Sequence, residues 1–440
     1  MAEAHLSLLY GLPFAGLLLC IATGPVLFAH AWEHHHGKIA AFWAACFLIP
    51  ALFQFPAGEV AHKLIHLALI DYVPFVVLVG SLYVTAGGIV VDGRLAGTPA
   101  RTTALLGVGA FLASVLGTTG ASMVLVRPLL KGISSRRRKA HSVVFFIFLV
   151  SNIGGSLTPI GDPPLFLGFL HGVPFLWTFH SIGPMLFLTA SLLVIHFALD
   201  LKAWNAETDR THHFVEDKAV GFGIRGKRNI VLLLLMVLSV LASGLIGSGL
   251  GTVTVLGTAL DWSGILRDVL LLILAALSLR HTPARLHKAN SFSWSPIQEV
   301  ATLFAGIFVC LLPLMSILQE GSQGALGWLV ASVRTPLQYF WATGILSSFL
   351  DNAPTYLLFF NVAGGDAALP RMIAEHTTLL AISCGAVFMG ANSYIGNAPN
   401  FLVRNLAEEH GIRMPSFGGY LLWSGCILVP LLALTGWIFF

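Results

Sequence analysis

The sequence predicts an all-α polytopic membrane protein, an inverted-topology repeat with about ten spanning helices, two re-entrant hairpins and two broken helices. Three observations support this fold class. The 440 residues are 56% hydrophobic and only 10% charged, a balance that soluble domains do not show. The apolar runs have helical length and lack the alternation of a membrane barrel. Glycine- and proline-containing breaks interrupt corresponding apolar runs in the two halves of the chain, which indicates an internal repeat.

Apolar runs of about 20 residues match a bilayer core roughly 30 Å thick. Such spans are expected at 8–30, 38–56, 72–91, 141–170, 182–201, 229–247, 265–280, 297–317, 374–402 and 418–438. Residues 56–70 are expected to form a helix in the outer membrane interface. The regions 103–130 and 327–361 are broken near their middles, so we interpret each as a re-entrant hairpin. The first run lacks a basic n-region and a cleavage site, which favours a retained helix over a signal peptide.

Basic residues orient the chain through the positive-inside rule. With the N-terminus outside, the 24 lysines and arginines fall on the cytoplasmic side except Lys63, Arg267, Arg334 and Arg371. We therefore expect a prokaryotic-type cytoplasmic (inner) membrane protein with cytoplasmic basic loops. The same threading gives each span of the first repeat an opposed counterpart in the second, within one domain, 1–440. Its parts are repeat 1 (38–201), a cytoplasmic linker (202–228) and repeat 2 (265–438), with 141–170 and 374–402 as broken helices.

The stretch from Ser151 to Leu167 is the centre of the prediction. It carries three glycines, three prolines and Asp162 inside an apolar region. A charge near the bilayer centre costs about 2.5–3.5 kcal/mol or more, so Asp162 indicates a functional site. A second copy aligns Ile160–Phe166 with Ile395–Phe401 and places Asn397 opposite Asp162. Interrupted segments precede both copies, at 116–122 and 349–355.

Two motifs, Thr158-Pro159-Ile160-Gly161-Asp162 and Asp351-Asn352-Ala353-Pro354-Thr355, resemble the ion transporter superfamily. That superfamily holds NhaD-type sodium/proton antiporters, arsenite permeases and citrate and dicarboxylate transporters, and the motifs are most similar to the NhaD type. Dicarboxylate members carry Ser-Asn-Thr at both hairpin tips, whereas this chain has Thr118-Thr119-Gly120 and Asp351-Asn352-Ala353. The resemblance covers about residues 38–438. It implies hairpins that meet at mid-membrane, a scaffold able to form a homodimer, and elevator-like movement of the transport half.

If the four breaks converge, they form an oxygen-rich site suited to hard cations such as Na⁺, and to protons. The candidate residues are Asp162, Asp351, Asn152, Asn352, Asn392, Asn397, Thr118, Thr119, Ser122, Thr158, Thr355 and Ser393. Arg127 is the nearest basic residue, one to two turns beyond its hairpin tip. Structural alternatives remain open: both aspartates as helix caps, and Thr118, Thr119 and Ser122 as small packing residues.

These residues predict secondary transport, first of all Na⁺/H⁺ antiport with competition of the two ions at Asp162 and Asp351. The alternative is a Na⁺- or H⁺-coupled carrier of citrate, a dicarboxylate or arsenite. An intramembrane hydrolase is a remote alternative, because no H-E-x-x-H or G-x-S-x-G motif is present. The expected partners are Na⁺, H⁺ and the lipid bilayer. No cofactor, nucleic acid or ATP is expected. The five cysteines stand singly, which argues against disulfides and structural zinc.

Overall fold

The computed structural model describes residues 7–93, 97–207, 223–290, 292–320 and 324–440. These ranges are almost entirely helical, and ten of their helices are long and apolar enough to cross a membrane. The prediction of an all-α polytopic membrane protein is confirmed.

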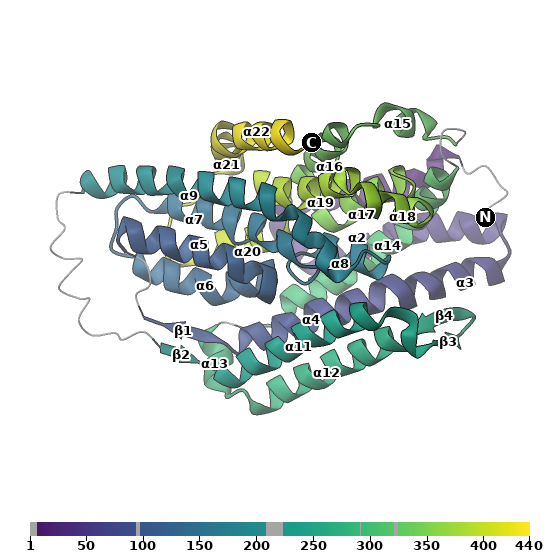
Figure 1. Cartoon of the computed structure of the whole chain (residues 1–440), viewed down its shortest axis with the longest axis horizontal. Helices are drawn as coiled ribbons and strands as arrows, with labels where there is room; N and C mark the ends of the chain where they lie inside the picture. Colours follow the sequence, from purple (N-terminus) through teal and green to yellow (C-terminus); the bar gives the residue numbers. More distant parts are fainter. Residues whose placement is uncertain (1–6, 94–96, 208–222, 291, 321–323) are drawn as a thin grey trace.

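One group of helices packs together as a scaffold, seen along the lower and right-hand parts of Figure 1. Its members are α1 (Leu12–Leu27, after η1, Leu8–Gly11), α2 (Ala29–Gln54), α3 (Ala57–Leu67), α4 (Val73–Gly87), α11 (Lys227–Ile246), α12 (Trp262–His281) and α14 (Ser295–Gln319). The π-helical turn η2 (Ala68–Tyr72) joins α3 to α4, so that 57–87 is one continuous helical segment. The expectation of a separate interfacial helix at 56–70 is therefore wrong. The polar residues of α3 are followed without a break by the π-helical residues Ala68, Leu69 and Ile70, which continue the helix into the apolar α4.

The remaining helices, together with the short turns between them, form what we call the transport half. From repeat 1 they are α5 (Pro99–Leu116), α6 (Thr118–Gly132), α7 (Ala140–Leu149), η3 (Ile153–Leu157), α8 (Pro163–Leu170), η4 (Phe175–Ser181) and α9 (Ile182–Asn205). From repeat 2 they are α16 (Pro336–Phe349), α17 (Asn352–Val362), α18 (Gly365–Glu375), α19 (Thr377–Met389), η7 (Gly390–Asn392), α20 (Ala398–Glu409), α21 (Phe417–Trp423), η8 (Ser424–Leu428) and α22 (Val429–Phe439). The short helices α13 (Ala284–Ala289) and α15 (Gly327–Ser332) precede α14 and α16.

Two helical hairpins enter the transport half from opposite ends (Figure 1). The α5–α6 hairpin turns at Gly117, whose φ of 76° is in the range that favours glycine. The α16–α17 hairpin turns at Leu350 and Asp351. In both cases one arm packs against the 3-10 turn of the neighbouring broken helix, α5 against η3 and α16 against η7. The hairpin tips and the helix breaks therefore lie at the same level.

Two short antiparallel strand pairs mark the ends of the molecule. Strand β1 (Val90–Asp92) pairs with β2 (Gly223–Arg225), and we call this side the linker end because the linker leaves from it. Strand β3 (Thr252–Val255) pairs with β4 (Thr258–Asp261) at the other side, the β3–β4 end. The all-α fold expected from the sequence contains no strands. The β3–β4 turn uses Leu256 and Gly257, both at positive φ, which matches the twist of a tight hairpin.

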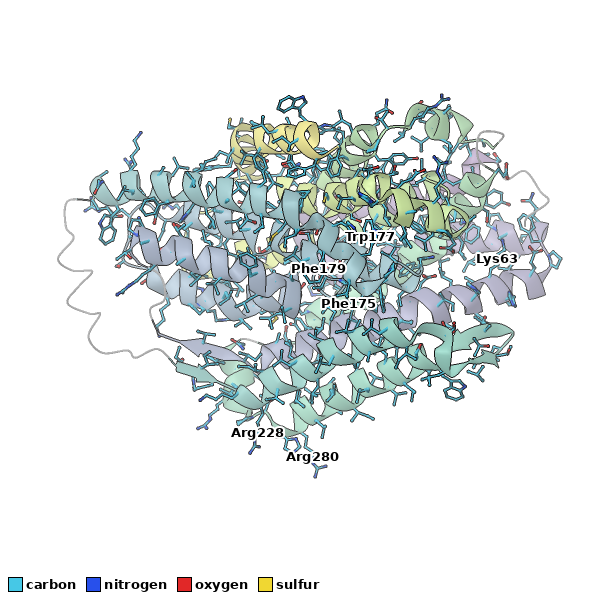
Figure 2. All side chains as sticks on the ribbon, in the orientation of Figure 1. Lys63, Phe175, Trp177, Phe179, Arg228 and Arg280 are labelled. Carbon is cyan, nitrogen blue, oxygen red and sulfur yellow. The ribbon has the colours of Figure 1, made fainter. Side chains whose placement is uncertain are left out.

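Three labelled basic side chains show where positive charge lies relative to the two ends. Arg228 and Arg280 project from the lower edge in Figure 2, on helices that begin or finish at the linker end, whereas Lys63 lies far from them at the right. Of the predicted linker 202–228, residues 208–222 lie outside the described residues. The flanking parts include the end of α9, strand β2 and the first two residues of α11.

Candidate functional site

Both helix breaks depend on glycine pairs that bring two backbone segments into contact. A Cβ atom on Gly161 would lie 2.1 Å from the carbonyl oxygen of Gly155. In the second copy, a Cβ atom on Gly396 would lie 2.5 Å from the carbonyl oxygen of Gly390. A side chain at either position would push apart the two backbone segments of the break, so only glycine fits. The two copies identified in the sequence thus share one backbone construction.

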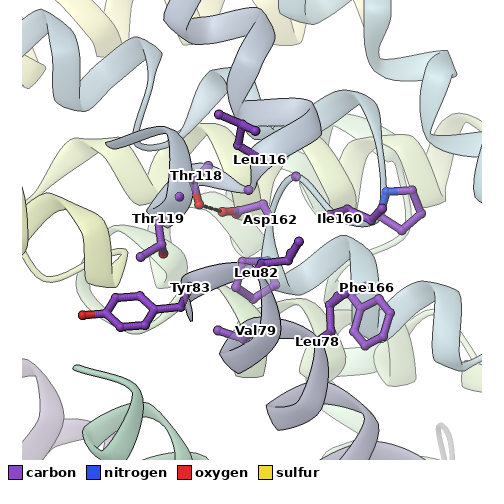
Figure 3. Close-up of a pocket in the computed structure, with 15 residues that line it drawn as sticks. Leu78, Val79, Leu82, Tyr83, Leu116, Thr118, Thr119, Ile160, Asp162 and Phe166 are labelled. Atoms are coloured by element: carbon purple, nitrogen blue, oxygen red, sulfur yellow. Dashed lines mark hydrogen bonds between the residues drawn. The ribbon is translucent and has the colours of Figure 1, made fainter. Parts of the chain in front are cut away.

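Asp162 lies at the centre of the breaks, with 1% of its surface exposed. Its Oδ1 accepts hydrogen bonds from Thr118 Oγ1 at 2.8 Å and from Asn397 Nδ2 at 3.2 Å. Its Oδ2 accepts from Asn352 Nδ2. Figure 3 shows the bond between Thr118 and Asp162. Although Asp162 immediately precedes α8, its side chain makes no capping hydrogen bond there. The carboxylate faces other segments of the chain.

The hairpin tips meet at this carboxylate. Thr118 is the first residue of α6 and Asn352 the first residue of α17, and both bond to Asp162. The backbone N–H of Thr118 also donates to the carbonyl of Gly161 at 2.8 Å. One side chain therefore ties together both hairpins and, through Asn397, both broken helices.

Four helix N-termini surround the carboxylate. Helices α8 and α20 begin directly after Asp162 and Asn397, and α6 and α17 begin with the residues at the two tips. A helix N-terminus carries partial positive charge, so each favours an anion. In α8 only this partial charge acts, because its first two residues are prolines and the N–H of Leu165 bonds to the carbonyl of Asp162. Among the described residues, no lysine or arginine bonds to Asp162. The positive character of this site comes from helix ends.

Asp351 is placed differently from Asp162. Its Oδ1 accepts a hydrogen bond from the backbone N–H of Ala353 at 3.1 Å, so it caps α17. It makes no hydrogen bond to Asp162, although the two carboxylates lie close enough to repel each other. This is the helix-cap arrangement that the sequence left open. The adjacent residue, Asn352, reaches the central carboxylate instead.

Most of the other predicted residues support the backbone of the breaks. The hydroxyl of Thr158 donates to the carbonyl of Ser114, and that of Ser393 donates to the carbonyl of Ser348. The remaining contacts are Asn392 Nδ2 to Ser348 Oγ (2.9 Å), Thr355 Oγ1 to the carbonyl of Asp351 (2.9 Å) and Ser122 Oγ with Ser151 Oγ (2.9 Å). These side chains position the central residues without contacting Asp162.

Asn152 and Asn400 form a second layer behind Asn397. Asn152 accepts a hydrogen bond from Asn397 at 3.2 Å and donates to Asn400 Oδ1 at 2.7 Å. Asn400 is fully buried and donates to the carbonyls of Gly390 and Ser393, both at 2.9 Å. Asn400 is not among the site residues predicted from the sequence. The aligned copies did contain a signal, because a polar Asn400 stands where the first copy has Leu165.

A small cavity of about 30 Å³ lies between this site and the scaffold helix α4. Its walls, drawn in Figure 3, include Leu78, Val79, Leu82, Tyr83, Leu116, Thr118, Thr119, Ile160, Asp162 and Phe166. Because each water occupies about 10–15 Å³ on this scale, the cavity has room for about two waters. A larger ligand would need α4 and the α5–α6 hairpin to separate. The buried Oδ1 of Asn352 has no hydrogen-bond partner beside this carboxylate, so an acceptor remains free there.

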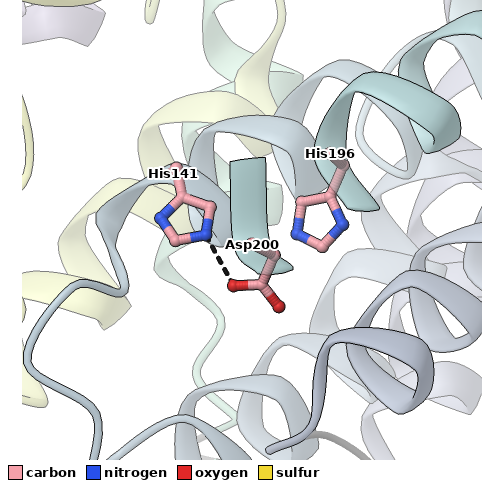
Figure 4. Close-up of side chains that lie close together, drawn as sticks. All are labelled: His141, His196 and Asp200. Atoms are coloured by element: carbon pink, nitrogen blue, oxygen red, sulfur yellow. Dashed lines mark hydrogen bonds and ion pairs between the residues drawn. The ribbon is translucent and has the colours of Figure 1, made fainter. Parts of the chain in front are cut away.

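His141, His196 and Asp200 form a second titratable cluster (Figure 4). They come from the first turn of α7 and the last turns of α9, near the linker end. The atoms that could bind a metal ion already have hydrogen-bond or ion-pair partners. Arg136 binds the Asp200 carboxylate at 2.7 and 2.9 Å, and His141 Nε2 lies 2.7 Å from it. The ring nitrogens of His196 lie 2.8 Å from Thr103 Oγ1 and 3.3 Å from Ser142 Oγ. A metal ion would have to displace the guanidinium, so we interpret the cluster as a buried ion pair.

A protein-family comparison supplies the assignment. A family model described as "Putative citrate transport" matches residues 3–440. The chain belongs to this family. No curated protein matches the chain. Membership of a citrate-transport family confirms the predicted ion transporter superfamily and a transport role at the membrane. The closer likeness to NhaD-type antiporters stays a prediction.

Proposed function

We propose that the protein is an ion-coupled secondary transporter of a small polycarboxylate such as citrate, and that Asp162 takes up the coupling Na⁺ or H⁺. The observation behind this proposal is one buried carboxylate held by Thr118, Asn352 and Asn397 and surrounded by four helix N-termini. The family assignment supports the anion as cargo.

The same site suits a cation and an anion for separate reasons. Asp162, the free Oδ1 of Asn352 and the carbonyls of the two breaks offer oxygen ligands to Na⁺. The partial positive charge of the helix N-termini favours substrate carboxylates. The three side chains that donate to Asp162 are uncharged. The negative charge of Asp162 is therefore balanced by the coupling ion.

Electrostatics then couples the two ligands. At about 5 Å and an effective dielectric constant of about 20, two carboxylates repel by about 3 kcal/mol, roughly a factor of 100 in affinity. Binding of Na⁺ or H⁺ to Asp162 removes this repulsion, so the ion and the substrate strengthen each other's binding by the same factor. Movement of the transport half against α4 and α14 then carries both across. In this proposal the linker end faces the cytoplasm.

Sodium/proton antiport is the second candidate function. It is favoured by the absence of a bonded lysine or arginine at Asp162 within the described residues. In that case the helix N-termini would only stabilise the ionised carboxylate, and Na⁺ and H⁺ would compete for it.

Proteoliposomes distinguish the two functions. Uptake of radiolabelled citrate is measured under an imposed Na⁺ or pH gradient, and collapse of a pH gradient is measured after NaCl, LiCl or KCl is added. We expect gradient-driven citrate uptake that Asp162→Asn abolishes and that the control Asp92→Asn, which removes a carboxylate paired with Arg225 at the linker end, retains. Collapse of the pH gradient by Na⁺, without citrate uptake or stimulation by citrate, would establish antiport instead.

A further inference from the structure

We propose that the substrate anion passes between the Asp162 cavity and the cytoplasm along α4, α6 and α20, and that Arg127 is the carboxylate-binding residue at the inner mouth of this route. The inference rests on the proposed function in that it takes the cargo to be an anion. It adds a binding residue and an access route outside the central site.

One face of α6 connects the cavity to Arg127. Thr119, Met123 and Arg127 are spaced by four residues and share this face. Thr119 lines the cavity. At 1.5 Å per residue, Arg127 lies about 12 Å farther along the helix, toward the linker end. Helix α20 packs along α6 and also leads away from the site to the linker end.

An apolar layer separates the cavity from Arg127. Tyr83, Met123 and Ile297 form a buried cluster, and Val79, Phe292 and Leu402 pack against it. The cluster joins scaffold residues from α4 and α14 to transport-half residues from α6 and α20. The Tyr83 hydroxyl donates to the carbonyl of Ser293 at 2.9 Å, a bond within the scaffold. Sliding of the transport half would therefore open this layer by separating apolar contacts alone.

The opposite end is closed by charged groups. His171, which follows α8, lies 2.8 Å from Asp366 of α18 and 3.2 Å from Asp71 of the scaffold turn η2. Opening at the β3–β4 end must separate a histidine from a scaffold carboxylate. Because the apolar layer has no such ion pair among the described residues, the linker end is the easier side to open from this arrangement.

Arg127 has guanidinium capacity left for a ligand. The side chain is half-buried, and its Nη1 is buried without a hydrogen-bond partner. Two other arginines near the linker end differ: Arg136 is paired with Asp200, and Arg404 pairs with Glu408 and lies over the ring of Tyr394. The acidic group that acts on Arg127 is Glu409, at the end of α20. A planar guanidinium matches the two oxygens of a carboxylate, so a polycarboxylate passing this face would be bound there.

A labelling experiment tests the route without requiring transport. Thr119→Cys is introduced into the full chain after Cys20, Cys46, Cys310, Cys384 and Cys426 are replaced by serine or alanine. Inside-out vesicles are treated with an anionic or a cationic methanethiosulfonate reagent, and both rates are measured. Asp162 lines the same cavity, and its effect on each reagent is the same in every variant. A unit charge at Arg127, about 12 Å away at an effective dielectric constant near 20, should raise the ratio of anionic to cationic labelling about tenfold or more.

The expected result is that Arg127→Gln lowers the ratio of anionic to cationic labelling about tenfold or more, whereas the matched control Arg404→Gln retains the ratio of the parent protein. An unchanged ratio in Arg127→Gln would overturn the role of Arg127. Failure of the introduced thiol to react from the cytoplasmic side, while it reacts from the other side, would overturn the route itself. A labelling ratio that depends on Arg127, without citrate transport, would leave the route intact and refute the proposed cargo. Citrate transport by a protein whose labelling ratio does not depend on Arg127 would support the proposed cargo and overturn the role of Arg127.

Transport kinetics provide a second readout. In inside-out vesicles, Arg127→Gln should raise the KM for citrate several-fold with little change in kcat, and Arg127→Lys should recover part of the affinity. A loss confined to kcat, with no rescue by lysine, would indicate a structural role and contradict the proposal.

Discussion

Replacement of Gly161 by alanine tests the close backbone contact on which the site depends. The new Cβ would lie 2.1 Å from the carbonyl oxygen of Gly155, and ordinary van der Waals separation requires the two segments to move apart by about 1 Å or more. Asp162 is the next residue, so a displacement of this size would break its 3.2 Å bond to Asn397 and lengthen its 2.8 Å bond to Thr118. Overpacking of this kind costs about 1–3 kcal/mol of stability, and misplacement of a binding group by about 1 Å reduces the rate about 100-fold.

The assay is the initial rate of citrate uptake per folded molecule, with folding followed by thermal unfolding in detergent. Gly161→Ala should transport about 100-fold more slowly. Gly396→Ala should show a similar loss, because its Cβ meets the carbonyl of Gly390 at 2.5 Å. Gly418→Ala on α21 is the control, since no atom lies within 4 Å of its new Cβ. Near-normal uptake by a folded Gly161→Ala protein would refute the view that this contact positions Asp162.

Three further predictions concern groups outside the central carboxylate. Asp200→Leu leaves a buried guanidinium without its partner and should lower stability by about 3 kcal/mol or more, measured as a reduced Tm. Burial alone lowers the pKa of His171, but the hydrogen bonds and charges of Asp366 and Asp71 reverse this and raise it to about 10. The histidine therefore stabilises the fold fully below about pH 6.5, and this contribution should decline as the pH rises toward 10. The Tm difference between wild type and His171→Gln, measured against pH, should follow that course, and a pH-independent difference would contradict it. Asn400→Leu should slow citrate uptake per folded molecule, because Asn152 loses a hydrogen-bond partner and the backbone of the second break loses two donors. A lower Tm with unchanged uptake per folded molecule would contradict a positioning role.

Much of the architecture is encoded locally and was predictable. Apolar runs of helical length identify membrane-crossing helices, and glycine and proline mark where helices cannot continue. The alignment of Ile160–Phe166 with Ile395–Phe401 predicted two equivalent breaks, and the structure builds both from the same glycine contact. Whether the hairpin tips meet was not readable from the sequence, because contact between Asp162 and Asn352 depends on packing across 190 residues of chain.

The roles of the two aspartates show where sequence reasoning reached its limit. Asp162 and Asp351 look equally exceptional in apolar surroundings. Their environments differ only through tertiary structure: Asp351 bonds to a backbone N–H two residues ahead, while Asp162 bonds to side chains from three distant segments. The contribution of α4 to the cavity wall was likewise invisible, since Leu78, Leu82 and Tyr83 read as ordinary lipid-facing or core residues. The continuation of α3 into α4 was missed because a π-helical turn has no clear sequence mark.

The two repeats share a backbone but differ in chemistry, and that difference gives the site its charge. Asp162 and Asn397 occupy equivalent positions in the two aligned copies, and Thr118 and Asn352 are the first residues of the second helix in their hairpins. A carboxylate at both equivalent positions, about 5 Å apart, would add roughly 3 kcal/mol of repulsion in a site that must also admit an anion. With a carboxylate in only one of the two breaks, one monovalent cation can neutralise Asp162, and the asparagine in the other copy donates to that carboxylate without adding charge. Asn397→Asp should therefore weaken citrate binding at neutral pH and restore it as acidification protonates the second acid, which a pH series of citrate affinities would show. Unchanged affinity across that series would mean that the substrate does not approach the equivalent positions.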